Sequence, residues 1–147
     1  MKARLEGLNA IHSARRGYSR QGQYGDKDDG RSMQIVSSDD AMATFEHPLV
    51  GTHNETGRKM LFVNQSYTIG IAGLPRDESK ALLEELFAHQ TSEPFVYRHR
   101  WQEGMLTMWD NRSVLHAATG GFEGHRRLLR RITVADRDAM LAAGQAA

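Results

Sequence analysis

The chain has 147 residues, and its 19 Lys and Arg residues nearly balance 18 Asp and Glu residues, for a net charge of +1. This length predicts one domain with one core, because a chain of this size buries about two-thirds of its unfolded surface. A net charge near zero excludes a whole-molecule field that would attract nucleic acid or a membrane. The absence of cysteine excludes disulfides and thiolate metal sites and indicates a cytoplasmic protein. No apolar run has the length of a signal peptide or a membrane span.

The N-terminal segment has apolar residues at helical spacing. Leu5, Leu8 and Ile11 recur about every three residues and predict one amphipathic helix over residues 1–16. Residues 17–44 then combine glycines and polar residues with few large apolar side chains, so ordering them would bring little burial. We expect a flexible loop there.

The composition changes at residue 45. The segments HPLVGTH and RKMLFV, joined by NETG, predict a hairpin in which Gly57 adopts a positive backbone angle. The segment RDESKALLEELFAH predicts a helix over residues 76–89, because acidic residues occupy its first turns and its large apolar residues form one stripe. That stripe consists of Leu82, Leu83, Leu86 and Phe87.

Four further strands are predicted beyond this helix. They alternate side chains between two faces and are separated by polar turns, the first of which is expected at residues 102–104. Their ranges are 95–101, 105–110, 113–118 and 126–134. Residues 139–147 are typical of a frayed tail. Two helices with four to six strands favour a mostly β, antiparallel architecture with helices packed outside.

The last predicted strand contains four arginines. Side chains alternate along a strand, so Arg127 and Arg131 point one way while Arg126 and Arg130 point the other. Arg127 and Arg131 would lie roughly 13 Å apart at their α-carbons, yet their long side chains can converge on one small anion. A guanidinium binds a carboxylate through two parallel hydrogen bonds. The alternatives are a solvated strand, or a nucleic-acid surface, which the alternation with apolar residues and the low net charge disfavour.

His116 ends an apolar run, where a lone histidine can be a packed residue or a metal ligand. The surrounding pattern is W-D-N-R-x-x-x-H followed by H-R-R-x-x-x-R. It resembles the C-terminal signature of the taurine dioxygenase (TauD/TfdA) family of Fe(II)- and 2-oxoglutarate-dependent oxygenases. The likeness covers most of residues 5–135, through GLNAIHS, HPLVGTHNETGRKMLFVN, ALLEELFAH and FVYRHRW. It implies that residues 45–138 are the C-terminal part of a double-stranded β-helix, or jelly roll, of the clavaminate synthase-like kind.

The resemblance also implies roles for individual residues. His116 matches the distal iron-binding histidine. Arg127 matches the arginine that pairs with the distal carboxylate of 2-oxoglutarate. Arg131 matches a second arginine near this co-substrate and the acidic group of the substrate. A neutral imidazole suits Fe(II), and a guanidinium suits a dicarboxylate. Of the other signature residues, Trp109 is expected in the core and Asp110 in the hydrogen bonds of a turn.

Oxygenases of this kind bind iron through two histidines and one carboxylate. In the family, a His-x-Asp or His-x-Glu motif carries two of these ligands, and we expect it upstream of this sequence. His53 and Glu55 have the required spacing, but they coincide with the predicted hairpin turn. We therefore expect weak or no Fe(II) binding by this chain alone. A partial jelly roll would also expose strand edges, so we expect a homo-oligomer or a complementing N-terminal half as partner.

Two functional hypotheses follow. In the first, the chain is the C-terminal part of a dioxygenase that couples decarboxylation of 2-oxoglutarate to hydroxylation of a small anionic, for example sulfonated, substrate. In the second, it is a catalytically inactive anion-binding or interaction module that keeps the arginines without iron. A His-x-Asp or His-x-Glu motif upstream in the same reading frame would favour the first. Neither hypothesis involves nucleic acid or a membrane.

Overall fold

A computed structural model describes residues 1–25, 35–121 and 123–134. The chain divides into two units, Met1–Leu115 and His116–Ala147. Within the described residues, all helices and strands lie in the first unit. In the same part of the chain, every helix is too short or too polar to span a lipid bilayer.

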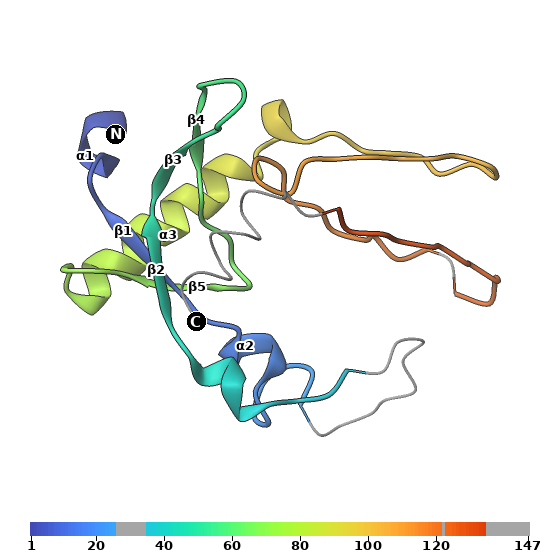
Figure 1. Ribbon diagram of the computed structural model, residues 1–147, viewed down its shortest axis with the longest axis horizontal. Coiled ribbons are helices and arrows are strands. Elements are labelled where there is room, and N and C mark those ends of the chain that lie inside the picture. Colours follow the sequence, from blue (N-terminus) through green and yellow to red (C-terminus); the bar gives the residue numbers. More distant parts are fainter. Residues whose placement is uncertain (26–34, 122, 135–147) are drawn as a thin grey trace. The chain divides into compact units, whose positions relative to one another are not determined.

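The first unit contains a three-stranded antiparallel sheet in the order β2-β1-β5 (Figure 1). The central strand β1 (Asn9–His12) pairs with β2 (Phe45–Pro48) on one side and β5 (Thr68–Ile71) on the other. His12 lies directly opposite Phe45 in this register. Because directly opposite residues share a face, these two side chains lie on the same side of the sheet.

The single helix predicted over residues 1–16 is wrong. The helix α1 (Lys2–Leu5) has four residues, and Gly7 follows it with a φ of 78°. This left-handed conformation, which glycine adopts without steric cost, ends the helical path before β1 begins. The helix α2 (Arg15–Tyr18) is a separate turn. The prediction failed because β1 forms ladder hydrogen bonds on both sides, and these outweigh a weak helical preference.

The hairpin predicted around NETG is confirmed. Strands β3 (Val50–Thr52) and β4 (Lys59–Leu61) pair antiparallel as a separate two-stranded sheet. Gly57 in the connecting turn has a φ of 67°, and its backbone N–H donates to the carbonyl of His53 over 2.8 Å. Local turn chemistry was therefore sufficient to predict this element.

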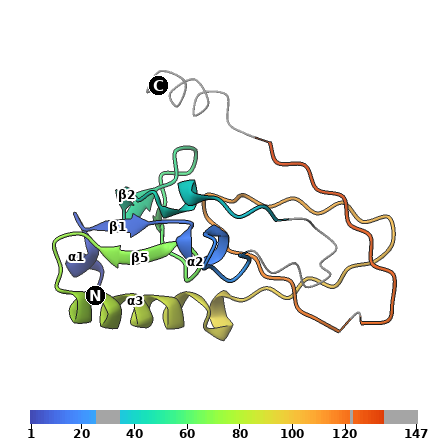
Figure 2. The same ribbon diagram turned by 90° about the horizontal axis from the view of Figure 1, so that it is seen from below.

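The helix predicted over residues 76–89 is also confirmed, as α3 (Arg76–Gln90), which runs alongside β5 and β1 (Figure 2). Ser79 Oγ accepts a hydrogen bond of 2.8 Å from the backbone N–H of Ile71, which ties the helix to β5. The predicted apolar stripe of α3 is buried against residues of the sheet and hairpin. The core consists of Leu5, Ala10, Leu49, Val63, Ile71, Leu82, Leu83, Leu86 and Phe87.

Two short 3-10 helices, η1 (Asp39–Met42) and η2 (Glu93–Phe95), complete the regular structure of the described residues. The first of them falls within the loop predicted over residues 17–44. There the Ser38 side chain caps η1 by accepting from the backbone N–H of Asp40. The described flanks of the predicted loop thus contain short ordered elements. Residues 26–34 of this loop, and the predicted tail, lie outside the described residues.

The four strands predicted beyond α3 do not form ladders in the described part of the chain. The turn predicted at residues 102–104 is present, with Gly104 at a φ of 76°, and His99 Nε2 lies 3.2 Å from Thr107 Oγ1 across it. A strand requires a neighbour with which to exchange backbone hydrogen bonds, so an alternating pattern alone does not form one.

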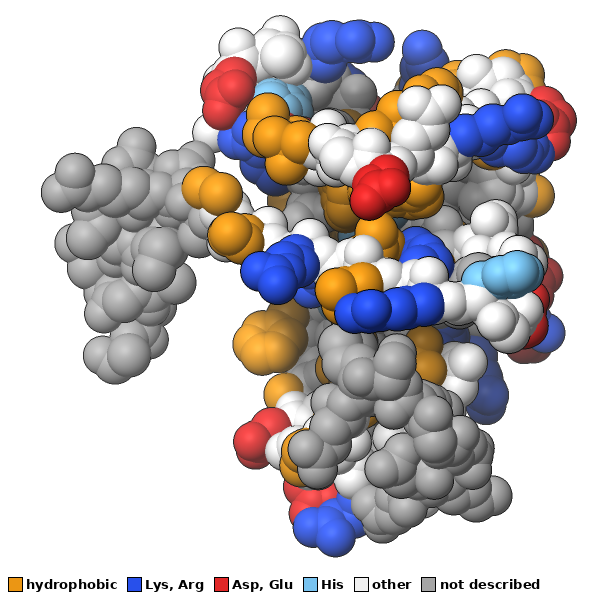
Figure 3. Space-filling view, turned by 90° about the vertical axis from the view of Figure 1, so that its right-hand side faces the viewer, with side chains coloured by type: hydrophobic (Ala, Val, Ile, Leu, Met, Phe, Trp, Pro, Cys, Tyr) orange, Lys and Arg blue, Asp and Glu red, His pale blue; other side chains and the backbone are white. Residues whose placement is uncertain are grey.

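These segments leave many large apolar side chains exposed. Figure 3 shows hydrophobic side chains next to Lys and Arg side chains on one face. The most exposed, each more than 80% accessible, are Tyr97, Leu106, Met108, Ile132 and Val134. Soluble domains rarely expose such groups in contiguous patches, and those that do commonly use them for association.

Candidate functional site

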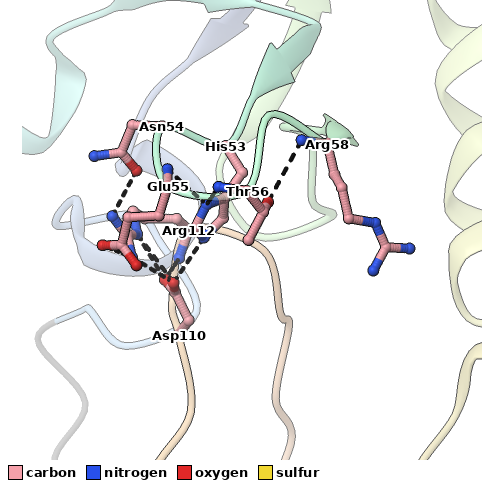
Figure 4. A network of polar contacts seen from close by, with 7 residues as sticks. All are labelled: His53, Asn54, Glu55, Thr56, Arg58, Asp110 and Arg112. Carbon is pink, nitrogen blue, oxygen red and sulfur yellow. Dashed lines mark hydrogen bonds and ion pairs between the residues drawn. The ribbon is translucent and has the colours of Figure 1, made fainter.

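Asp110 is the centre of a polar network that joins the hairpin turn to the turn of the W-D-N-R stretch in the first unit (Figure 4). Arg112 donates through Nε to Asp110 Oδ1 over 2.9 Å and through Nη2 to Oδ2 over 2.7 Å. The backbone N–H of Arg112 also donates to Oδ1, over 2.8 Å. On the other side, His53 Nε2 lies 2.9 Å from Oδ2. Each carboxylate oxygen therefore has at least two partners.

The hydrogen bonds of His53 define its tautomer. This residue is only 8% exposed, and its Nδ1 accepts from the backbone N–H groups of Glu55 and Thr56 over 3.3 and 3.4 Å. A ring nitrogen that accepts carries no hydrogen, which assigns the proton to Nε2 and makes His53 the donor toward Asp110. His53 thus caps its own turn with one nitrogen and binds a distant carboxylate with the other.

Arg112 extends the network to the hairpin. Its Nη1 donates to Asn54 Oδ1 over 2.7 Å, and its Nη2 donates to Glu55 Oε1 over 3.1 Å. Along the chain, Arg112 is separated from Asn54 by 58 positions and from Glu55 by 57 positions. A planar guanidinium suits this role, because its five N–H donors can bind several oxygens at fixed angles.

The network perturbs the acid–base properties of its members. The Arg112 guanidinium, followed by His53 and the backbone N–H of Arg112, holds the pKa of Asp110 well below its usual range. Asp110, followed by Glu55, raises the pKa of Arg112. Both groups are therefore charged at neutral pH.

The network agrees only in part with the sequence interpretation. The turn hydrogen bonds expected of Asp110 are confirmed, since its backbone carbonyl accepts from Ser113 and Val114. The core position expected of Trp109 is wrong: this residue is 38% exposed, and its Nε1 donates to Asn111 Oδ1. Trp109 follows a segment that forms no ladder, so no sheet encloses it in the described residues.

The His-x-Glu spacing of His53 and Glu55 does not form a metal site in this structure. Both ring nitrogens of His53 are engaged, and Glu55 pairs with Arg112. Among the described residues, no group of three His, Asp or Glu side chains could hold a metal ion. His116 can contribute one imidazole, but these residues do not fit a complete three-ligand iron site.

The three residues assigned from the signature all belong to the second unit. His116, Arg127 and Arg131 are all exposed, in a stretch without regular secondary structure. The described residues of this unit include four arginines and a single carboxylate, Glu123, which accepts from the backbone N–H of Gly121 over 3.1 Å. The donor set has the charge and the guanidinium chemistry that a dicarboxylate requires.

The described chain thus combines an antiparallel β unit and its packed helix with the W-D-N-R-x-x-x-H pattern, and with the H-R-R-x-x-x-R pattern that contains the paired arginines. The family model "Taurine catabolism dioxygenase TauD, TfdA family" matches residues 1–133. The chain belongs to this family.

Two curated relatives illustrate the similarity. The chain is 41% identical over 136 residues to the alpha-ketoglutarate-dependent 2,4-dichlorophenoxyacetate dioxygenase of Cupriavidus pinatubonensis, covering 92% of this chain and 44% of the relative. It is 37% identical over 119 residues to the (S)-phenoxypropionate/alpha-ketoglutarate-dioxygenase of Sphingobium herbicidovorans. This match covers 81% of this chain and 40% of the relative. The chain thus spans less than half the length of these relatives.

A solved structure supports the fold class. The taurine dioxygenase of Burkholderia xenovorans superimposes with a TM-score of 0.56 at 32% identity, over 76% of this chain and 31% of that protein. The predicted class, a partial jelly roll with flanking helices, is confirmed by this likeness together with the antiparallel strands described above. These relatives are dioxygenases by name, which favours the oxygenase hypothesis over the inactive module.

Proposed function

We propose that this chain is the C-terminal part of an Fe(II)- and 2-oxoglutarate-dependent dioxygenase that oxidises a small anionic substrate. The observation that carries the proposal is the W-D-N-R-x-x-x-H and H-R-R-x-x-x-R pattern, which lies within the family match over residues 1–133. In the complete enzyme, substrate oxidation would be coupled to decarboxylation of 2-oxoglutarate. His116 would be one iron ligand, and the other two would come from outside this sequence.

The arginines would hold the co-substrate. Arg127 is proposed to pair with the distal carboxylate of 2-oxoglutarate, and Arg131 to lie near the co-substrate and the acidic group of the substrate. Both are exposed and belong to the same unit as His116, which supports a shared role. Two relatives are named for 2,4-dichlorophenoxyacetate and phenoxypropionate, which supports an organic acid as the substrate class.

Partner and location belong to the same proposal. We propose that a complementing N-terminal half, or a second copy of the chain, pairs with the segments that form no ladder, because unpaired strand edges accept a neighbour. We propose the boundaries 45–138 for this part of the jelly roll. A cytoplasmic location is supported by the absence of cysteine.

The proposal is tested by complementation. The part of the Cupriavidus pinatubonensis relative that this chain does not match is co-expressed with the chain, and 2-oxoglutarate binding is titrated without oxygen. Arg127→Ala should weaken binding by about one to several powers of ten, because a charge-assisted hydrogen bond contributes about 1.5–3 kcal/mol and a bidentate pair has two. Arg131→Ala should have a smaller effect.

The matched controls are Arg126→Ala and Arg130→Ala, which remove equal charge from the opposite side of the predicted strand. Both should leave affinity nearly unchanged. Equal losses in all four variants would show that the arginines act as a diffuse positive surface. An unchanged affinity in Arg127→Ala would remove its co-substrate role even if iron bound at His116.

A further inference from the structure

A groove of about 670 Å³ lies between α3 and β5 in the first unit, where the two elements run alongside each other (Figure 2). Its helical side consists of Arg76, Ser79, Lys80, Leu83, Glu84 and Phe87. Side chains three and four positions apart are neighbours on a helix, so these residues form one continuous stripe. From Arg76 to Phe87 the stripe extends over roughly 16 Å, at 1.5 Å of rise per residue. The helical side is therefore long enough for a linear molecule.

The strand side of the groove is apolar and open. Ile11, Ile69 and Leu74 line it and are only half-buried. A Cβ added at Gly70 would lie 3.8 Å from Ile11 Cδ1 and from Ser79 Oγ, both of which belong to residues of the lining. Because glycine has no Cβ, this volume is free for an occupant. Apolar surface in the groove is thus within reach of a ligand.

The charges of the groove favour an anion. Its lining contains one carboxylate, Glu84, and three cations, Arg16, Arg76 and Lys80, for a net charge of +2. Arg16 Nη1 donates to the backbone carbonyl of Gln65 over 2.8 Å. Within the described part of the chain, Arg76 forms no ion pair. Lys80 lies 3.8 Å from Glu84, whereas a charge-assisted hydrogen bond is about 2.7–2.9 Å long, so a closer anion can compete.

The stripe on α3 is cationic at one end and apolar toward the other. Arg76 and Lys80 are one helical turn apart and exposed, so both can reach one small anionic group without its complete desolvation. Leu83 and Phe87 follow along the stripe. Glu84 lies one turn beyond Lys80, where it disfavours a second anionic group. This order suits a molecule with one anionic end and an apolar chain.

We propose that this groove binds a linear aliphatic monocarboxylate, with its carboxylate at Arg76 and Lys80 and its chain along the apolar side. The proposal goes beyond the dioxygenase function, because the occupant requires neither iron nor 2-oxoglutarate. All residues of the groove belong to the first unit, whereas His116, Arg127 and Arg131 belong to the second. Binding can therefore be tested on the chain as it is.

Octanoate is the probe, and the methyl resonances of Leu and Ile in the isotope-labelled chain are the readout. Octanoate should shift the signals of Ile11, Leu74 and Leu83 saturably, while those of the exposed Leu106 and Ile132 stay in place. Decanoate should bind more tightly, by up to about fifteenfold, because each of its two added methylenes contributes up to about fourfold when buried. Octanamide keeps the chain without the charge and should bind more weakly than octanoate.

Equal affinities for octanoate and octanamide would overturn the proposal, because the cations would then contribute nothing. Shifts that do not saturate would do the same. Shifts of equal size at Leu106 and Ile132 would assign binding to the exposed apolar segments beyond α3, and the groove would then not be a site.

Two double variants test the contact with the carboxylate. Arg76→Gln/Lys80→Gln should weaken octanoate binding by about three- to thirtyfold, because two exposed charge pairs are lost. Arg4→Gln/Arg58→Gln removes equal charge from exposed positions outside the groove and should leave the affinity nearly unchanged. Circular dichroism checks that both are folded. If the first is not, the comparison of octanoate with octanamide on the unmodified chain decides.

Equal weakening in both double variants would show that only the overall charge matters, which would overturn the proposal. A loss of octanoate binding in Arg127→Gln, with the affinity of Arg76→Gln/Lys80→Gln unchanged, would assign the probe to the proposed co-substrate arginines. That outcome would overturn the groove as a site and leave the proposed dioxygenase function intact.

Discussion

Asp110 shows how one carboxylate can join two loops that are far apart in the sequence. The guanidinium of Arg112 and the imidazole of His53 both hydrogen-bond to its carboxylate. The same guanidinium also donates to Asn54 in the hairpin turn. Arg112 stands four positions before His116 in the chain. The network therefore fixes the turn from which the proposed iron-binding segment departs.

Asp110→Asn is expected to reduce the acid sensitivity of the fold. The pKa of Asp110 is lower in the folded chain than in the unfolded one, so its charge stabilises the folded state above the unfolded pKa of about 3.9. That contribution is lost as the pH falls from there through the folded pKa. Between about pH 5 and pH 2, the unfolding free energy of the unmodified chain should fall more steeply than that of the variant, as measured by urea denaturation.

Asn54→Ser is the matched control for this measurement. It removes one acceptor of Arg112 and leaves every partner of Asp110 in place. The unfolding free energy of Asn54→Ser should depend on pH in the same way as that of the unmodified chain. Identical slopes for Asp110→Asn and the unmodified chain would show that the ion pair contributes no pH-dependent stability. Added salt should reduce the difference in slope between Asp110→Asn and the unmodified chain. The Asp110 side chain is 34% exposed, so salt screens its charge.

The sequence predicted the roles of some of these residues but not their long-range contacts. The spacing of the signature singled out His116, Arg127 and Arg131, because their roles attach to a contiguous pattern. It also predicted a turn at Asp110. The partnership with His53 could not be predicted, since the two residues are 57 positions apart and neither local pattern indicates the other. The burial of His12 Nε2 was likewise not predicted, because residues 1–16 were expected to form one helix, whereas His12 lies in the strand β1.

At the level of elements, predictions succeeded where local chemistry decides the structure. The hairpin follows from its turn residues, and α3 follows from an apolar stripe with acidic residues in its first turn. The predictions failed where pairing with distant strands decides the local structure. Residues 9–12 form a central strand because two other strands pair with them, and neither partner can be inferred from the spacing of Leu5, Leu8 and Ile11.

Gly57→Ala is expected to destabilise the first unit by about 1–2 kcal/mol, the cost of a left-handed backbone for a residue with a side chain. An added Cβ at this position would meet no atom within 4 Å, so the cost comes from the backbone alone. Gly70→Ala is the control. Its Cβ would make ordinary 3.8 Å contacts with Ile11 and Ser79, without a positive φ. Equal midpoints for the two variants in urea denaturation would contradict the assignment of the turn.

Ser79→Ala is expected to cost about 1–3 kcal/mol, because it leaves the buried backbone N–H of Ile71 without its acceptor. Lys80→Ala, one position along α3, removes only an exposed 3.8 Å ion pair with Glu84 and should cost a few tenths of a kcal/mol. Thermal unfolding of both variants measures the difference. Similar effects would show that the contact between α3 and β5 depends on apolar packing alone.

At the level of the whole molecule, the chain spans less than half the length of its curated relatives, and the predicted strands beyond α3 form no ladders in its described part. Their alternating patterns predicted strands, but none of these segments is a strand in the described residues. A strand ladder needs a neighbouring strand, and the local pattern of a segment does not determine its neighbour. The side chains of Leu106 and Met108 are 88% and 85% exposed, and the proposed partner would cover them.

The purified chain is therefore expected to self-associate, with an apparent mass above that of the 16.5 kDa monomer that rises with concentration in light scattering. The double variant Leu106→Lys/Met108→Lys should shift it toward the monomer, because it replaces two exposed apolar groups with charges on one side of the segment. Gln102→Lys, which adds a charge at the neighbouring turn without removing apolar surface, should associate like the unmodified chain. A monodisperse monomer of the unmodified chain would show that these exposed groups do not drive association. If Gln102→Lys lowered the apparent mass as much as the double variant, the added charge would explain the loss of association, and the removal of apolar surface would not.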